Sequence, residues 1–239
     1  MSETVIQVSS LGKRIKGKTI LEEISFEINK GDCVALIGPN GAGKTVLMSC
    51  ILGDKKPSSG QVLIDGKAGK AKNKIAVLLQ ENTIPNSLKV EELIAFFQSI
   101  SDNPLTNQEV QELLQFKEDQ YQQFADKLSG GQRRLLAFVL CLIDKPKILF
   151  LDEPTAGMDT STRQRFWEIV NDLKKSGTTI LYSSHYIEEV EHTADRILVL
   201  HQGKLIRDTT PYAMRHEEKE KQVTLPSSFV SIVHGLSDI

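Results

Sequence analysis

The chain has 239 residues, of which 40% are hydrophobic and 25% are charged. This balance is typical of a globular protein with a sizeable core, and it excludes a disordered chain or a small disulfide-stapled scaffold. The net charge of −2 does not favour nonspecific nucleic-acid binding. The longest apolar run, 135–143, is far shorter than the roughly 20 residues of a membrane-spanning helix. We expect no secretory signal, and the three scattered cysteines fit a reducing cytosol.

The first seventy residues predict mainly β structure, because short apolar or alternating runs are separated by turn residues. Helical spacing between the runs 33–37 and 61–64 predicts one helix at 44–52, which ends at Gly53. Strands are predicted at 5–8, 20–28, 33–37, 61–64 and 75–79.

Helical spacing then prevails from residue 90 to about 124, with a break at Asn103-Pro104. Helices and strands alternate after residue 140, which is the pattern of an α/β core with a parallel sheet. The all-helical stretch therefore indicates a subdomain inserted between two core strands. Later helices are predicted at 131–143, 160–175 and 187–194, and strands at 147–151, 178–183, 196–201 and 204–207.

A phosphate-binding pattern, G-x-x-x-x-G-K-[ST], lies between a predicted strand and a predicted helix. Glycines let the loop turn its backbone N–H groups inward, and the following helix adds the positive end of its dipole. Lys44 would reach the β- and γ-phosphates of a nucleotide, and Thr45 would bind Mg²⁺. A simple glycine-rich turn is the alternative, but the strand-loop-helix context favours nucleotide binding. The residues are Gly38, Pro39, Asn40, Gly41, Ala42, Gly43, Lys44 and Thr45.

A second chemical signal is the apolar strand that ends in Asp152 and Glu153. Buried strands rarely end in two acids unless a cation or a proton needs them there. Asp152 would hold Mg²⁺ directly or through a water, and Glu153 could polarise an attacking water as a base. Taken alone, the pair could equally be a strand end that reaches solvent.

The segment Leu128-Ser129-Gly130-Gly131-Gln132 precedes a predicted helix. Ser129 can cap this helix, and the glycines leave backbone N–H groups bare, so this is a second helix start suited to phosphate. One nucleotide does not need two such sites in one chain. Two copies of the chain that face each other would use both.

In this order and spacing, the motifs resemble those of the nucleotide-binding subunit of ATP-binding cassette (ABC) transporters, over residues 5 to 212. The resemblance implies an α/β fold: a P-loop NTPase (RecA-like) core with an N-terminal antiparallel β-subdomain and an inserted α-helical subdomain. It implies an ABC ATPase domain at 5–215, with the helical subdomain at about 82–140, and a short tail at 216–239. The short tail and the segment 154–159 resemble bacterial drug or peptide exporters.

The resemblance also implies roles for single residues. Gln80 would touch Mg²⁺ or the attacking water, and His185 would contact the γ-phosphate and hold Glu153 in place. Asp159 would bridge a dimer. The γ-phosphate of ATP held by the other subunit would be bound by the signature segment, through Ser129, Gly130, Gly131 and Gln132.

The implied cofactors are ATP and Mg²⁺, and the implied partners are a second ATPase subunit, in a head-to-tail homodimer, and a separate transmembrane permease. The chain would lie on the inner face of the cell membrane through that permease, docking by residues 82–127, and no nucleic acid is expected. One departure concerns Ile15, which occupies the position where the family usually has an aromatic residue that stacks on adenine.

Two other functions compete with a transporter subunit. The first is a soluble ABC ATPase that acts on nucleic acid or ribosomes, although only 48 residues separate Gln80 from Ser129, too few for long coiled-coil arms. The second is a P-loop GTPase or kinase, which would leave the LSGGQ segment unexplained. Four lysines at 67, 70, 72 and 74 predict a solvated loop, with an anionic-lipid or nucleic-acid patch as the alternative.

Overall fold

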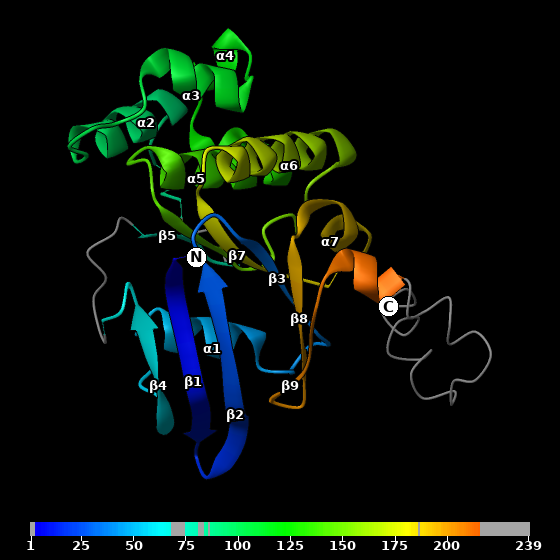
Figure 1. Cartoon of the computed structure of the whole chain (residues 1–239). Helices are drawn as coiled ribbons and strands as arrows, with labels where there is room; N and C mark the ends of the chain where they lie inside the picture. The colour runs from blue at the N-terminus through cyan, green and yellow to red at the C-terminus, as the bar shows by residue number, and fades with distance from the viewer. Residues whose placement is uncertain (1–2, 68–74, 81–83, 86, 186, 216–239) are drawn as a thin grey trace. The chain divides into compact units, whose positions relative to one another are not determined.

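The computed structural model describes residues 3–67, 75–80, 84–85, 87–185 and 187–215 (Figure 1). The chain divides into two compact units. Met1–Lys72 and Leu181–Ile239 form the first, and Asn73–Ile180 form the second. Three of the four lysines between 67 and 74 and the predicted tail at 216–239 lie outside the described residues.

The first unit contains an antiparallel sheet of β1 (Thr4–Ile15), β2 (Lys18–Asn29) and β4 (Ser59–Ile64), in the order β2-β1-β4. Helix α1 (Lys44–Ile51) packs against it, next to β2 and β4 (Figure 1). This is the antiparallel β-subdomain that the sequence predicts.

Strand β1 is longer than predicted, since it continues past residue 8 to Ile15. Its pairing with β2 shifts register between Val8 and Leu11, and Ser10 has a positive φ of 46° in this interval. The irregularity breaks the alternation of apolar and polar residues. The prediction therefore stopped at residue 8, because the alternation of apolar and polar residues ends where the pairing becomes irregular.

The same unit contains β3 (Cys33–Ile37), which pairs in parallel with β8 (Arg196–His201), and β9 (Lys204–Thr209), which pairs antiparallel with β8. All five residues of β3 are buried, as expected for a central parallel strand. Helix α7 (Ile187–Thr193) contacts β3.

The turn between β2 and β3 has the sequence Asn29-Lys30-Gly31-Asp32, which matches the form Asn-Lys-x-Asp of a guanine-reading motif. Here its polar groups hold a turn. The Asn29 N–H donates to the Asp32 carboxylate at 2.9 Å, and the Asp32 N–H donates to the Asn29 carbonyl at 3.1 Å. The Lys30 ammonium forms an ion pair with Glu3 at 3.1 Å. In this structure the four residues therefore form the turn that connects β2 to β3.

The second unit pairs β5 (Ile75–Leu78) with β6 (Ile148–Leu151) in parallel, with Leu78 opposite Leu151. Strand β7 (Thr179–Ser184) begins in this unit and continues into the first. Its helices are α2 (Val90–Ser99), α3 (Asn107–Leu114), α4 (Glu118–Gln122), η1 (Ala125–Lys127), α5 (Gly130–Leu142) and α6 (Thr160–Lys175).

Helices α5 and α6 lie side by side in the second unit (Figure 1). Helices α2 and α3 contact α5, and α4 contacts α2. The rings of Phe138 on α5 and Phe166 on α6 are 4.3 Å apart between centroids. The predicted break at Asn103-Pro104 is confirmed, because it lies between the end of α2 and the start of α3. Thr106 caps α3 in a capping box with Glu109.

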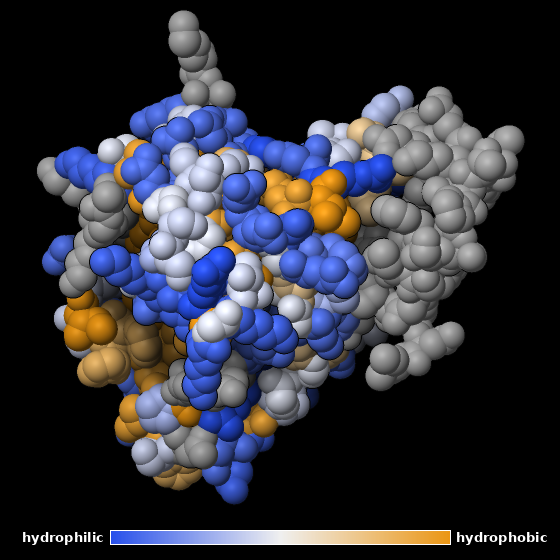
Figure 2. Space-filling model, turned by 90° about the horizontal axis from the view of Figure 1, so that it is seen from below, coloured by the Kyte–Doolittle hydropathy of each residue, from blue (hydrophilic) through white to orange (hydrophobic). Residues whose placement is uncertain are grey.

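Among the described residues, no helix is both long and apolar enough to cross a bilayer. Figure 2 shows a mostly hydrophilic face, with hydrophobic areas that are separate from one another.

Replacing Phe166 with Ala should lower the free energy of unfolding of the second unit by about 3–5 kcal/mol, because removal of the ring leaves a cavity in a close-packed interior. Phe166 is fully buried, at 0% exposure, between Phe138 and Trp167. Urea unfolding followed by tryptophan fluorescence reports on this site, since the chain has one Trp. The matched control is Phe96→Ala on α2, which is 54% exposed and should shift stability by less than about 0.5 kcal/mol. Equal losses in the two variants would contradict this core assignment.

Candidate functional site

The phosphate-binding loop lies between β3 and α1 in the first unit. Gly41 and Gly43 have φ values of +80° and +107°, a region that residues with a Cβ rarely adopt. A Cβ at Gly38 would overlap the carbonyl oxygen of Leu200. The Ala42 carbonyl accepts a hydrogen bond of 3.0 Å from the Gly203 N–H, which ties the loop to the turn between β8 and β9. The loop is thus shaped by glycines and held by the main chain.

Lys44 begins α1 and is 6% exposed. Its ammonium donates to the carbonyl oxygens of Gly38 at 2.7 Å and Pro39 at 3.4 Å, so the cation lies against the loop. The first turn of α1 contains no acidic residue, and its N-cap, Gly43, offers no side chain. The positive end of the helix dipole is therefore not offset by a local carboxylate, which suits an anion at this place.

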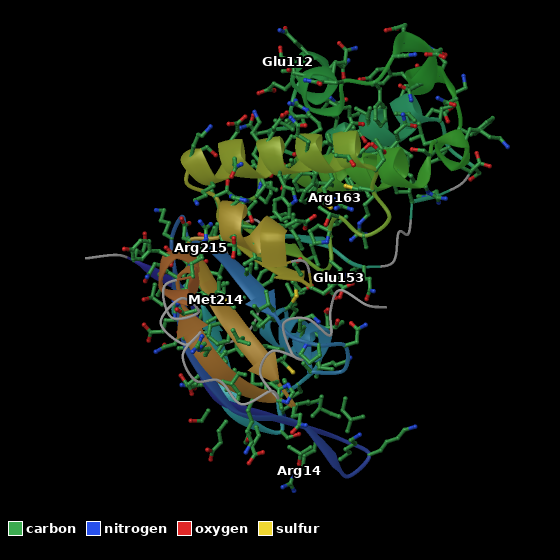
Figure 3. All side chains as sticks on the ribbon, turned by 90° about the vertical axis from the view of Figure 1, so that its right-hand side faces the viewer. Arg14, Glu112, Glu153, Arg163, Met214 and Arg215 are labelled. Carbon is green, nitrogen blue, oxygen red and sulfur yellow. The ribbon has the colours of Figure 1, made fainter. Side chains whose placement is uncertain are left out.

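The two predicted acids and Gln80 lie at adjacent strand ends in the second unit. The Asp152 N–H donates to the Leu78 carbonyl at 2.8 Å, which continues the pairing of β5 and β6 by one bond. Asp152 is 4% exposed. Gln80 Nε2 donates to Glu153 Oε2 at 3.4 Å, so these two side chains meet. Figure 3 labels Glu153 in the loop that follows β6.

The backbone of Glu153 has a φ of +44°. A residue with a side chain in this left-handed region carries strain on the order of 1–3 kcal/mol and stays there only when its surroundings fix it. Such strained positions occur often at functional sites, and this one is the proposed base.

The signature segment caps helix α5, as expected. Ser129 Oγ accepts a hydrogen bond of 3.2 Å from the Gln132 N–H, and Gln132 Oε1 accepts one of 3.2 Å from the Ser129 N–H. This reciprocal pair is a capping box. A Cβ at Gly131 would lie 3.2 Å from Asp159 Oδ2 and 3.3 Å from Met158 Cα. The glycine therefore lets the start of α5 approach the segment 156–159 closely.

Asp159 is the N-cap of α6. Its carboxylate accepts hydrogen bonds from the Ser161 hydroxyl at 2.7 Å, and from the Thr162 N–H at 3.0 Å and hydroxyl at 2.7 Å. These bonds, that of the Ser161 hydroxyl first, lower the pKa of Asp159 well below its ordinary range. Because the group stays ionised through the acidic range, its contribution to stability is present at neutral pH and is lost only as the pH falls below the ordinary range of a free aspartate.

The second unit thus brings Gln80 beside Glu153, and Gly131 beside Asp159. The phosphate-binding loop belongs to the first unit, as does the half-buried His185, which directly follows β7. Ile15 is half-buried at the end of β1.

Sequence analysis missed one buried charge, Arg134 on α5. It is 3% exposed, and its guanidinium donates to main-chain carbonyls at the ends of β5 and β6. The available signal was a charged residue directly before the apolar run 135–143, on the predicted helix that follows the signature segment.

Comparison with known families bears on this arrangement. The family model described as "ABC transporter" matches residues 21–156, which is more than half of the 239 residues. The chain belongs to the ABC transporter family. The resemblance inferred from the motifs and the predicted fold class are both confirmed.

Related ABC proteins cover nearly the whole chain. It is 30% identical to the "Probable multidrug ABC transporter ATP-binding protein YbhF" of Escherichia coli over 244 residues, covering 97% of this chain but 42% of that protein. It is 33% identical to the "Nod factor export ATP-binding protein I" of Burkholderia orbicola, covering 91% of this chain and 75% of that protein. A solved "ATP binding subunit of ABC transporter" superposes with a TM-score of 0.80 at 25% identity, covering 95% of this chain and 99% of that one.

Replacing Lys44 with Ala should weaken ATP binding to the isolated subunit by about 10-fold or more, because charge-assisted hydrogen bonds contribute on the order of 1.5–3 kcal/mol. Titration with a fluorescent ATP analogue measures this affinity. The control is Lys30→Ala, in the turn between β2 and β3, which should bind like the parent.

Ser129→Arg should spare ATP binding to the isolated subunit, because Ser129 would meet the nucleotide of a second copy. The same titration, followed by size exclusion with ATP, separates binding from dimerisation. An equal loss of monomer affinity in Lys44→Ala and Ser129→Arg would contradict a site shared by two chains.

Proposed function

We propose that this chain is the ATP-binding and ATP-hydrolysing subunit of an ABC exporter. Two copies dimerise head-to-tail on two ATP molecules and drive a separate membrane permease. The observation that carries the proposal is the pair of helix starts suited to phosphate: the loop before α1, and the Ser129-capped start of α5. Each ATP would lie between the loop of one copy and the signature segment of the other, where both chains bind its γ-phosphate.

Within each site, the loop residues 38–45 hold the phosphates. Thr45, Gln80 and Asp152 hold Mg²⁺, since their hydroxyl, amide and carboxylate oxygens are the ligand type that Mg²⁺ prefers. The placement of Asp152 and Gln80 at adjacent strand ends supports this donor set. The ion would neutralise charge on the β- and γ-phosphate oxygens.

Hydrolysis uses few covalent steps, so the residues mainly position groups and stabilise charge. Glu153 polarises the attacking water, and Gln80, 3.4 Å from the Glu153 carboxylate, orients that carboxylate and the water. His185 contacts the γ-phosphate. Ser129, Gly130, Gly131 and Gln132 of the second copy close the site, next to Asp159 of that copy.

ATP thus supplies contacts that join the two copies, and hydrolysis removes them. The permease converts this closing and opening into transport. Residues 82–127 form its docking surface, and within the described part of this range Phe96, Ile100 and Phe124 are exposed apolar side chains. Through the permease, the subunit lies on the inner face of the cell membrane.

Export is favoured by the relatives, one named a multidrug transporter protein and another a Nod factor export protein. The alternative, action on nucleic acid or ribosomes, finds no support among them. Fractionation tests the difference, because a transporter subunit should sediment with membranes only when its permease is co-expressed.

Replacing Glu153 with Gln should lower the ATP turnover rate by about 10² or more, since it removes the base and keeps the shape of the side chain. ATP should then hold a stable dimer, visible by size exclusion, because the γ-phosphate persists. Glu112→Gln on α3, also labelled in Figure 3, serves as the control and should turn over ATP like the parent. Parent-level hydrolysis in Glu153→Gln would show that Glu153 is not the base.

Replacing Ile15 with Tyr should tighten ATP binding, because an aromatic face stacked on a base contributes about 1–3 kcal/mol, roughly 5- to 150-fold in affinity. The parent, whose contacts are then mainly to phosphate and Mg²⁺, should bind and hydrolyse GTP within about tenfold of ATP. Competition of both nucleotides against a fluorescent ATP analogue measures these affinities. Ile206→Tyr, at an exposed position on β9, controls for a general effect of tyrosine. A strong ATP preference in the parent that Ile15→Tyr leaves unchanged would mean that another side chain covers the adenine.

A further inference from the structure

Arg134 lies in the second turn of α5 and is almost fully buried, at 3% exposure. Its guanidinium binds main-chain carbonyls on two segments, one that leaves β5 and one that leaves β6. Nε donates to Pro154 O at 3.1 Å, Nη1 to Leu79 O and to Gln80 O at 3.1 Å, and Nη2 to Asp152 O at 3.0 Å and Glu153 O at 3.4 Å.

We propose that Arg134 is a positioning residue for ATP hydrolysis, which holds from helix α5 the two backbone segments that carry Gln80 and Glu153. The inference rests on the proposed function, because it concerns the residues assigned there to the attacking water. Arg134 acts through these segments and has no assigned contact with ATP.

The number of donors matches the number of acceptors. A guanidinium has five N–H donors in a planar fork, and five carbonyl oxygens accept from it here. A buried charge is costly unless its donors are all satisfied. The loss of any one of the five acceptors would therefore destabilise the guanidinium at this place. Burial lowers the pKa of Arg134, and the nearby charges of Asp152 and Glu153 oppose this shift. The group remains a cation, since arginine is not deprotonated in proteins.

The strained backbone of Glu153 explains why such a cluster is needed. A left-handed φ of +44° persists only where the neighbouring peptides are fixed. Arg134 binds the carbonyls of Asp152, Glu153 and Pro154, on both sides of the strained residue. It therefore supports this conformation directly.

The same guanidinium binds the carbonyls of Leu79 and Gln80, so it sets the distance between the two loops. The 3.4 Å contact of Gln80 Nε2 with Glu153 Oε2 depends on that distance. A general base must be held within about 0.5 Å of its productive position, and a displacement of about 1 Å can cost on the order of 10² in rate. Loss of the guanidinium and its hydrogen bonds should thus lower the rate of the hydrolysis step and leave phosphate binding unchanged.

The test is Arg134→Lys, which keeps the positive charge but offers three donors from one nitrogen, too few for five acceptors. The single-turnover rate at saturating Mg·ATP should fall by about tenfold or more, while the affinity of the monomer for a fluorescent ATP analogue stays within about twofold of the parent. The matched control is Arg165→Lys on α6. Arg165 also donates to main-chain carbonyls, those of Leu113 and Glu112, at the end of α3. It should hydrolyse ATP at close to the parent rate.

A double-mutant cycle with Glu153→Gln separates positioning from general stability. Once the base is removed, adding Arg134→Lys should change the residual rate by less than about twofold, because its effect runs through Glu153. A loss by the same factor in both backgrounds would overturn the inference, as would parent-level hydrolysis in Arg134→Lys. Failure of both Arg134→Lys and Arg134→Gln to fold would also overturn it, since the role would then be structural.

The outcomes distinguish this inference from the proposed function. If Glu153→Gln abolishes turnover and Arg134→Lys does not, only the role of Arg134 fails. If Glu153→Gln turns over ATP like the parent, the assigned base and with it the proposed mechanism fail first.

Discussion

Carbonyl groups at the ends of parallel strands lose their partners where the strands diverge, and a buried carbonyl without a donor is costly. In this chain, the ends of β5 and β6 meet that requirement through one guanidinium on α5. The backbone there can leave regular strand geometry, and Glu153 takes a conformation that a strand would not allow. These hydrogen bonds and the pairing of β5 with β6, which continues to Asp152, together place the acids and Gln80.

The first unit meets a related requirement in a different way. Around the phosphate-binding loop, glycines open the backbone, and the first N–H groups of α1 have no partner within the helix and point along its axis toward the loop. The ammonium of Lys44 donates to carbonyl oxygens of the loop, so the cation lies next to the proposed anion site. In both units, main-chain groups therefore shape the chemistry, and side chains supply charge at a few points.

Much of this could be predicted from the sequence where local signals are strong. Helix α6 was predicted at 160–175 and is observed at Thr160–Lys175. In the structure Asp159 caps its start, so the local sequence sets where this helix begins. The cap at Ser129 was predicted from its side chain and its place directly before a predicted helix, and it is confirmed. The extent of β1 was not, since its irregular pairing with β2 interrupts the alternation.

The residues of the candidate site could also be predicted only in part. The order of the motifs predicts which residues belong to the site. The contact of Gln80 with Glu153 depends on the pairing of β5 with β6, which lie about seventy positions apart in the sequence. The pattern marks Arg134 only as a charge beside an apolar run, and it cannot name the partners of this residue, because they are carbonyls that every residue possesses. The tetrapeptide at 29–32 shows the opposite case, in which a chemical pattern has a purely structural use.

Contacts with the main chain also have a consequence for how this family varies. The five carbonyls bound by Arg134 would remain after most changes of side chain at 79, 80 or 152–154. A substitution at these positions therefore puts no pressure on the arginine to change with it. Methods that detect contacts from pairs of positions that change together would therefore not report this contact, although five hydrogen bonds make it up.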